Sequence, residues 1–295
     1  MQTILITGAT DGIGLALARR YQMAGHRLIL IGRRALADLA DPLFSAESYC
    51  QADLVEPNCT AQISSWLHTH NITAVDLVIH NAALGYVGTT ATQPEASIRE
   101  LVQVNLWAPI ALSHMLFPCV TRARGKICFI TSVATAFPGP NYAVYTATKA
   151  ALEGFVRSWQ VELVADESPV RLQIIRPGAT RTNMHAKSGA DLEQLRTHRF
   201  PSPAVVALQV AQAVSGHERS VTLGVTNRLA HGVGSLLQTS TRLDNASAGA
   251  TFRERQQTGI IDSLFPPRRN PGSRRRHWSS VGRAIGCDWL YDYRN

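Results

Sequence analysis

Short apolar runs alternate along the chain with longer segments in which apolar residues recur at helical spacing. The short runs are rich in β-branched residues and bounded by turn residues, which is typical of buried strands. The predicted strands lie at about 3–7, 28–31, 49–52, 75–80, 126–131, 170–175 and 220–223. The predicted helices lie at about 15–24, 57–70, 95–118, 143–165, 203–214 and 226–240. This alternation predicts an α/β fold, a doubly wound parallel sheet flanked by helices on both faces.

A glycine-rich turn joins the first predicted strand to the first predicted helix. Glycines let the backbone pass close to a pyrophosphate, and a helix N-terminus offers N–H donors and a positive dipole. A strand, a glycine turn, a helix and a second strand form the context that a dinucleotide site requires. The alternative is an ordinary structural turn. The expected cofactor contacts here are Gly8, Thr10, Asp11, Gly12, Ile13 and Gly14.

The end of the second predicted strand indicates which dinucleotide would bind. An acidic residue there would bind the ribose 2′-hydroxyl of NAD, but this chain has Arg33 and Arg34. Two guanidinium groups suit the 2′-phosphate of NADP. We therefore expect NADP(H) with Arg33 as the main contact, and NAD(H) as the alternative cofactor. An ordinary solvated arginine pair is the other interpretation.

A serine, a tyrosine and a lysine form the candidate catalytic group. Tyr145 and Lys149 stand four residues apart, which places them on one helix face. A free tyrosine titrates near 10, and a nearby ammonium lowers that pKa. Tyr145 is then a candidate proton donor to a carbonyl whose oxygen Ser132 could hold. Interface packing for the tyrosine, a solvated lysine and a capping serine are the alternatives.

Polar residues also follow the other predicted strands at the point where each ends. Asp53, Asn81, Ser132 and the pair Pro177-Gly178 all occupy such positions. In doubly wound sheets, ligands bind at the carboxyl ends of the strands. We therefore expect the candidate functional residues to lie close together at the carboxyl ends of the predicted strands.

Composition narrows the class of protein. The 295 residues are 45% hydrophobic, which allows a substantial core. No apolar run approaches the roughly 20 residues of a membrane span, and no leader precedes the first strand, so we expect a cytoplasmic protein. Five widely spaced cysteines without a Cys-x-x-Cys pair support neither disulfides nor a metal site.

Charge divides the chain into two parts. Residues 259–295 hold seven arginines and three aspartates, so four of the eight net positive charges lie there. We expect residues 1–258 to form one catalytic domain that is only mildly basic and does not bind nucleic acid. Residues 259–295 are turn-rich and basic, which predicts a disordered tail. The tail is either idle, as an altered reading frame would make it, or it binds an unknown anionic partner.

Taken together, the motifs resemble those of the compact, single-domain short-chain dehydrogenases/reductases over about residues 3–258. The pattern runs through Thr7-Gly8-x-x-x-Gly12-x-Gly14, Asn81-Ala82, Ser132, Tyr145-x-x-x-Lys149 and Pro177-Gly178-x-x-x-Thr182. Ser132 precedes Tyr145 by 13 residues, as is common in that family. The resemblance implies a single Rossmann-like domain that acts as an oxidoreductase.

The same resemblance implies roles for individual residues. Tyr145 would be the general acid or base, Lys149 would bind the nicotinamide ribose and lower the tyrosine pKa, and Ser132 would orient the substrate oxygen. Asn105 would hold a water that links Lys149 to solvent; the alternative is a bond to backbone in its own helix. Further cofactor contacts would come from Asp53, Leu54, Asn81, Ala82, Pro177, Gly178, Thr180 and Thr182.

Three positions depart from the family pattern. His80 and Ala83 stand where the family often has Asn and Gly, and we interpret His80 as structural. Asp11 lies in the glycine turn, where NADP-preferring relatives often carry a basic or hydroxyl residue. Its carboxylate is a candidate cap for the following helix.

The expected activity is hydride transfer between NADP(H) and a small carbonyl or secondary alcohol. A catalytically weak dinucleotide-binding regulator or scaffold is the alternative. By resemblance, the segments with Asn105 and Tyr145 would pair in a homodimer or homotetramer, with Trp107 and Leu112 either at that interface or in the core. Residues 183–202 and Phe137 are candidates to contact the substrate, whose identity the sequence leaves open.

Overall fold

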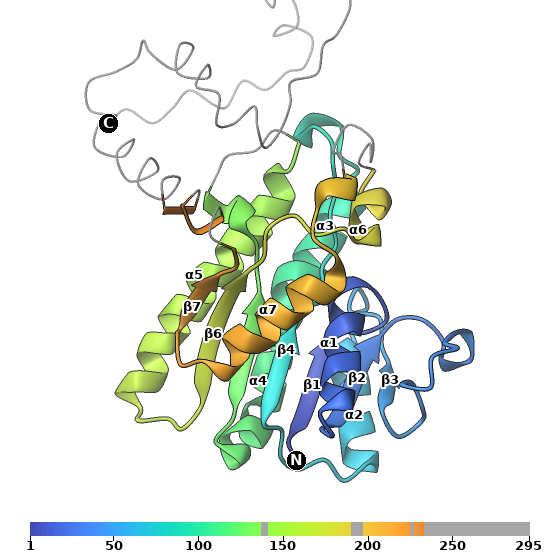
Figure 1. The fold of residues 1–295 in the computed structure, drawn as a ribbon, viewed down its shortest axis with the longest axis vertical. Coiled ribbons are helices and arrows are strands. Elements are labelled where there is room, and N and C mark those ends of the chain that lie inside the picture. Colours follow the sequence, from blue (N-terminus) through green and yellow to red (C-terminus); the bar gives the residue numbers. More distant parts are fainter. Residues whose placement is uncertain (137–140, 190–196, 225–226, 230, 233–295) are drawn as a thin grey trace, which may run out of the picture. The chain divides into compact units, whose positions relative to one another are not determined.

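One parallel sheet forms the centre of the protein. The computed structural model describes residues 1–136, 141–189, 197–224, 227–229 and 231–232. Within them, seven strands are ordered β3-β2-β1-β4-β5-β6-β7 (Figure 1). They are β1 (Thr3–Thr7), β2 (Arg27–Gly32), β3 (Tyr49–Gln51), β4 (Leu77–His80), β5 (Lys126–Ile130), β6 (Arg171–Arg176) and β7 (Ser220–Thr222). The order steps outward from β1 in both directions, so the predicted doubly wound sheet is confirmed.

Helices cover both faces of this sheet. They are α1 (Gly12–Met23), α2 (Cys59–Thr69), α3 (Glu95–Val102), α4 (Ala108–Ala123), α5 (Ala143–Ala165), α6 (Asn183–Lys187) and α7 (Pro203–Ser215). Helices α1 and α7 pack on one face, while α2, α4 and α5 pack on the other (Figure 1). Alternation along the strands creates the two cores. In β1, Leu5 joins one core, whereas Ile4 and Ile6 join the other.

The segment predicted as one helix at 95–118 is longer and less regular. A π-helical turn, Gln103–Trp107, separates α3 from α4, and α4 continues to Ala123. Pro118 lies inside α4 without ending it. Its side chain is on the exposed face, where water can bind the carbonyl oxygen that the missing N–H leaves free.

By length and composition, the continuous helical segment Glu95–Ala123 passes the test for a membrane span, and 44% of its most apolar window is buried. This corrects the expectation that no apolar segment is long enough. The segment nevertheless packs against β4, β5 and α5 and carries buried Leu112. Its apolar residues are therefore accounted for by the core.

Some of the predicted segments lie partly or wholly outside the residues that the structure describes. Residues 183–202, the candidate substrate-contacting segment, contain α6, which the sequence pattern missed. Of the helix predicted at 226–240, residues 227–229 and 231–232 are described and are helical. Phe137, the domain boundary at 258 and the tail lie outside the described residues.

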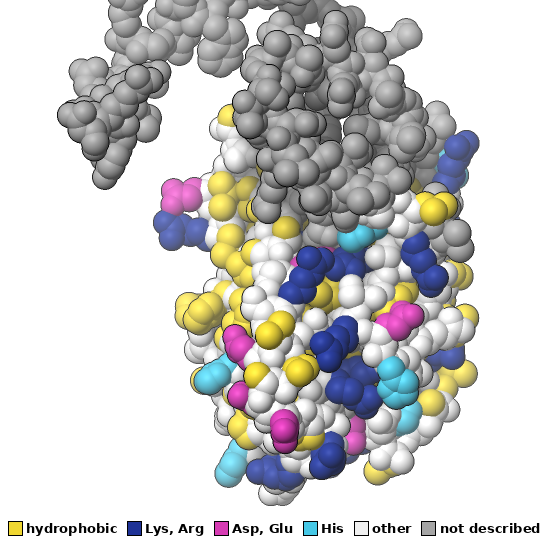
Figure 2. Space-filling view, turned by 90° about the vertical axis from the view of Figure 1, so that its left-hand side faces the viewer, with side chains coloured by type: hydrophobic (Ala, Val, Ile, Leu, Met, Phe, Trp, Pro, Cys, Tyr) yellow, Lys and Arg dark blue, Asp and Glu magenta, His cyan; other side chains and the backbone are white. Residues whose placement is uncertain are grey.

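The face at the β7 edge of the sheet shows how the charges of the described residues are distributed. Figure 2 shows basic side chains on this face among apolar and acidic ones. The exposed arginines include Arg171 at the start of β6 and Arg219 just before β7. Basic side chains on this face are thus mixed with other kinds of side chain.

Candidate active site

The glycine turn after β1 is packed too tightly for side chains. Gly8 and Gly12 have φ values of +66° and +54°, which L-residues rarely adopt. A Cβ on Gly14 would lie 2.2 Å from the Gly8 carbonyl oxygen. Asp11 caps α1 by accepting a hydrogen bond from the Gly12 N–H at 2.7 Å, so its predicted capping role is confirmed. The result is a narrow backbone cradle at a helix N-terminus, which suits a diphosphate.

Asn81 joins the ends of β4 and β1 beneath this cradle. Its side-chain Nδ2 donates to the carbonyl oxygens of Thr7 and Gly8 at 3.0 and 3.2 Å. The N–H groups of Asn81 and Ala82 both donate to the Thr7 hydroxyl. Asn81 therefore fixes the ends of the two strands to each other, and Ala82 lies against Gly8.

The two arginines predicted to select the dinucleotide follow β2 and are exposed. The Arg34 guanidinium lies 3.5 Å from the Thr10 carbonyl oxygen of the glycine turn. The Tyr49 hydroxyl donates to the Arg34 carbonyl oxygen at 2.7 Å and fixes the backbone there. With the cradle beside them, these cations fit a dinucleotide that carries a 2′-phosphate.

Asp53 and Leu54 lie next to the same strand end. The N–H of Ala52 donates to the Gly32 carbonyl oxygen at 2.8 Å, which continues the pairing of β2 and β3. The Asp53 carboxylate accepts from the Val55 N–H, and Leu54 is buried. Both residues therefore lie beside the strand end that carries Arg33 and Arg34.

Ser132, Tyr145 and Lys149 come together at the carboxyl end of β5. Ser132 follows the strand by two residues, and its side chain is hydrogen-bonded to that of Tyr145. Lys149 lies one turn farther along α5, and its Nζ donates to the Ile130 carbonyl oxygen at 3.0 Å. The fold thus brings together the three residues that the sequence singled out.

The electrostatics of this group differ from the sequence-based expectation. Burial raises the pKa of Tyr145, and the hydrogen bond with Ser132 lowers it only in part. The expected lowering of that pKa by Lys149 was wrong, because the Lys149 ammonium points to the Ile130 carbonyl oxygen and the phenol is buried. Burial also lowers the pKa of Lys149 to about 8, while the charge of Glu153 opposes that shift.

Asn105 lies in the π-helical turn and is buried. Its side chain accepts from the Leu84 N–H at 2.8 Å and donates to the Leu84 carbonyl oxygen at 2.9 Å. It also donates to the Thr148 hydroxyl at 3.2 Å. Asn105 therefore bonds backbone outside its own helix, and it ties the segment after β4 to the residue before Lys149.

The Pro177–Thr182 segment faces the glycine turn across the site. The Val133 N–H donates to the Pro177 carbonyl oxygen at 3.1 Å, next to Ser132. The Thr180 hydroxyl donates to the Gly178 carbonyl oxygen. A Cβ on Gly12 would lie 3.1 Å from the Thr182 methyl group. The segment therefore lies beside both the catalytic group and the cradle.

Helix α6 follows directly and also contacts the glycine turn. The Lys187 ammonium lies 3.1 Å from the Asp11 carboxylate, to which Asn183 also donates at 3.2 Å. The Val87 N–H donates to the Ser188 carbonyl oxygen at 2.8 Å. The sequence analysis marked Asp11 as unusual but missed its partners, because a separation of more than 170 residues leaves no local signal.

His80 lies beneath the site in the core. Its Nε2 is 2.8 Å from the Ser113 hydroxyl, and its ring packs against Phe129. Burial lowers the pKa of His80 to about 3. A neutral, fully buried imidazole is structural, as expected.

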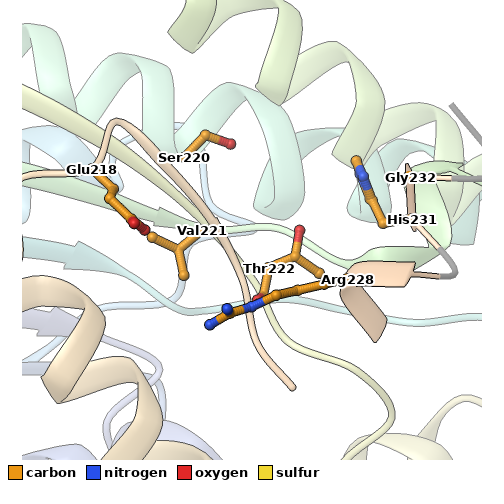
Figure 3. A pocket seen from close by; sticks show the side chains of 7 residues that line it. All are labelled: Glu218, Ser220, Val221, Thr222, Arg228, His231 and Gly232. Atoms are coloured by element: carbon orange, nitrogen blue, oxygen red, sulfur yellow. The ribbon is translucent and has the colours of Figure 1, made fainter. Parts of the chain in front are cut away.

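A cavity of about 320 Å³ lies apart from the residues described above (Figure 3). It is bounded by β7 and the segment that follows it, and it contains none of the predicted catalytic residues. Ser220 at its wall accepts a hydrogen bond from Arg176 at 2.6 Å. The lining residues are Glu218, Ser220, Val221, Thr222, Arg228, His231 and Gly232.

Known proteins share both the sequence pattern and the fold. A family model described as short chain dehydrogenase matches residues 2–193. A Drosophila melanogaster dehydrogenase/reductase SDR family protein 7-like is 32% identical over 238 residues, which cover 75% of this chain and 72% of that protein.

Solved structures of short-chain and alcohol dehydrogenases are similar to this chain in fold and sequence. A short-chain dehydrogenase from Sphingobium yanoikuyae in complex with NADPH has a TM-score of 0.68 and 26% identity, over 86% of this chain and 100% of that one. A Thermococcus sibiricus alcohol dehydrogenase complexed with 5-hydroxy-NADP has a TM-score of 0.65 and 26% identity, over 76% of this chain and 96% of that one.

Proposed function

Because this chain belongs to the short-chain dehydrogenases, we propose that it is an NADP(H)-dependent oxidoreductase that interconverts a small carbonyl compound and its alcohol, with Tyr145 as general acid and base. The observation that carries the proposal is the meeting of Ser132, Tyr145 and Lys149 at one strand end. The glycine cradle lies at the neighbouring strand ends, where parallel sheets bind ligands.

The reaction divides between the cofactor and the chain. When bound, the dinucleotide supplies or accepts a hydride at its nicotinamide ring. In reduction, the Ser132 hydroxyl holds the carbonyl oxygen and the Tyr145 hydroxyl donates a proton to it. The raised pKa of Tyr145 keeps this hydroxyl protonated at neutral pH, as a proton donor requires. In oxidation, the proton moves in the reverse direction, from the alcohol to the Tyr145 oxygen, while Lys149 lies one turn farther along the same helix.

NADP(H) rather than NAD(H) is favoured by the exposed Arg33 and Arg34 after β2. An arginine contacts phosphate by charge-assisted, bidentate hydrogen bonds. Two of the related structures contain NADPH or an NADP derivative. NAD(H) stays as the second cofactor in this proposal, because an exposed arginine does not exclude a ribose 2′-hydroxyl.

Tyr145→Phe tests the mechanism. It should lower turnover by about 10²- to 10⁴-fold, because general acid catalysis is lost, and leave NADPH binding within about twofold. Turnover is measured with a panel of ketones and aldehydes, and binding by calorimetry. Tyr21→Phe is the matched control, since that buried hydroxyl in α1 has no hydrogen-bond partner among the described residues.

Retained turnover in Tyr145→Phe would refute the mechanism. Wild-type protein that binds NADPH but turns over no carbonyl compound would favour the binding regulator or scaffold instead. Binding of neither NADPH nor NADH would overturn the proposal as a whole.

The proposal extends to assembly and location. We infer a homodimer or homotetramer in which α4 and α5 pair with a second copy, in the cytoplasm. Trp107 is 55% exposed next to α4, which supports a contact there, whereas Leu112 is fully buried in the core of its own chain. Sedimentation of wild type and Trp107→Ala tests this, and unchanged association in the variant would remove Trp107 from the interface.

A further inference from the structure

A buried ion pair lies beneath the catalytic group. Glu153 of α5 and Arg176 at the end of β6 are joined by two hydrogen bonds, Nε to Oε1 at 2.7 Å and Nη2 to Oε2 at 2.6 Å. The two side chains are only 6% and 4% exposed. We call this pair and its hydroxyl partners the clamp, and nothing in the catalytic scheme above uses it.

Hydroxyl groups from other segments complete the clamp. Glu153 Oε1 accepts from the hydroxyls of Thr131 and Thr135 at 2.9 and 3.2 Å. On the other side, Arg176 Nη1 donates to the Ser220 hydroxyl of β7, which also borders the cavity in Figure 3. An exposed arginine, Arg157, adds a longer contact to Glu153 at 3.2 Å. The buried carboxylate is therefore saturated with directional donors.

Three clamp residues lie next to proposed functional residues, either along the chain or one helical turn away. Thr131 immediately precedes Ser132, and Arg176 immediately precedes Pro177. Glu153 lies one helical turn beyond Lys149 and two turns beyond Tyr145. One carboxylate thus joins the strand end that carries Ser132, the helix that carries Tyr145 and Lys149 and, through Arg176, the start of the Pro177–Thr182 segment.

Stability does not explain such an arrangement. A buried ion pair can often be replaced by apolar residues without loss, because desolvation offsets the attraction. What apolar contacts lack is direction, and directional hydrogen bonds fix three segments in one geometry. The charge of Glu153 also raises the pKa of Lys149 against the effect of burial, which helps keep that lysine cationic.

We propose that the Glu153–Arg176 clamp is the positioning device of the nicotinamide half of the site. It holds Ser132, Lys149 and the segment from Pro177 in mutual register, while the adenine half depends on the glycine turn and Arg33. The inference rests on the proposed function, because it presumes a dinucleotide whose two halves lie on these two parts of the chain. Its consequence is selective: loss of the clamp weakens contacts to one half of the cofactor only.

The test compares a whole cofactor with its adenine half. Glu153→Gln keeps the shape and one carbonyl acceptor but removes the charge. Calorimetry then measures binding of NADPH and of adenosine 2′,5′-bisphosphate, which lacks the nicotinamide. We expect NADPH to bind about tenfold more weakly or worse, with the bisphosphate within about twofold of wild type. If wild type binds only NADH, then NADH and ADP replace the two probes.

Arg157→Gln is the matched control, because it removes only the exposed contact to Glu153. Both probes should bind this variant as they bind wild type. Equal NADPH affinity in wild type and Glu153→Gln would overturn the inference. So would equal weakening of both probes, because that result indicates general damage to the fold.

A second variant covers the case in which Glu153→Gln does not fold. Glu153→Met combined with Arg176→Leu removes both charges and fills the space, so no buried charge is left unpaired. It should fold, with NADPH binding still weakened and bisphosphate binding unchanged. Wild-type NADPH affinity in this double variant would also overturn the inference. Failure of the proposed function is distinct, since wild type would then bind neither NADPH nor NADH.

Discussion

Two carboxylate–cation pairs border the candidate site, and they share little beyond their chemistry. Glu153 and Arg176 are buried, bidentate and 2.6 Å apart at their closest atoms. Asp11 and Lys187 make a single contact at 3.1 Å, with side chains that are 44% and 62% exposed. The first pair joins elements of the sheet and α5, whereas the second joins the glycine turn to the short helix α6.

The difference shows how burial assigns different tasks to similar groups. Separating the partners of a buried pair would leave an uncompensated buried charge, which is energetically costly. The paired geometry is therefore kept. An exposed pair is screened and contributes about 0–1 kcal/mol, so it opens easily. We therefore expect the catalytic side of the site to be fixed and the α6 side to open for the cofactor and substrate.

The largest effect should follow from breaking the buried pair. Arg176→Met leaves Glu153 buried without its cation, and should lower the free energy of unfolding by about 3–5 kcal/mol. Chemical denaturation measures this change. Arg157→Met is the control: it breaks only the exposed contact to Glu153, and should stay within about 0.5 kcal/mol of wild type. Similar losses in the two variants would show that burial does not separate the contacts.

The next largest effect should be a loss of unfolding free energy on acidification, caused by the buried His80. The pKa of His80 is about 3 in the folded chain and near 6.5 when unfolded. Below pH 6.5 the unfolded state binds the extra proton, so stability is full above that pH and falls as the pH drops towards 3. Between pH 7 and pH 4 the loss should be about 3 kcal/mol.

Denaturation of wild type and His80→Asn at several pH values checks this expectation. Asparagine does not titrate, so the variant should have a flatter dependence over that range, while the carboxylates contribute equally to both proteins. If the free energy of unfolding depended on pH in the same way in both proteins, His80 would not be the cause of the acid sensitivity.

Cofactor preference should change by a smaller amount. Arg33→Asp places a carboxylate where the 2′-phosphate is expected, and should shift the ratio of NADPH to NADH affinity towards NADH by about tenfold or more. Calorimetric titration with both cofactors measures the ratio. Arg27→Asp makes the same charge change on an exposed residue at the opposite end of β2, and should leave the ratio unchanged. An unaltered ratio in Arg33→Asp would make Arg33 a surface residue only.

The smallest effects should come from the exposed pair. Asp11→Asn keeps a helix cap, and Lys187→Gln keeps the length of the side chain, so each should alter the free energy of unfolding by less than about 1 kcal/mol. If this contact governs entry, both variants should bind NADPH up to about fivefold faster in stopped-flow measurements. Association rates equal to that of wild type would show that α6 does not control entry.

The parts of the site that depend on local pattern could be predicted from the sequence. Gly8, Gly12 and Gly14 mark a turn that needs glycine, and the spacing of Tyr145 and Lys149 places them on one helix face. Helix α5 begins and ends at the residues predicted. Helix α6 was missed, because five residues are too few for a periodic signal.

The clamp was also missed, although a trace of it is visible in the sequence. Glu153 lies on the same helix face as Tyr145 and Lys149, at a spacing of four residues from the lysine. A charge on an otherwise buried face is a sign of a partner elsewhere. The identity of that partner, Arg176, depends on the neighbouring positions of α5 and β6 in space.

The alternation of strands and helices, the glycine turn and the residues that end each strand could be predicted from the sequence, because they follow from local conformational preference and periodicity. The direction of the Tyr145 pKa shift and the different burial of the Glu153 and Asp11 ion pairs could not, because they depend on contacts between distant parts of the chain. Both depend on solvation. The energy of a charge or a phenol depends on how much water reaches it and which partner lies within about 3 Å, and packing alone sets both.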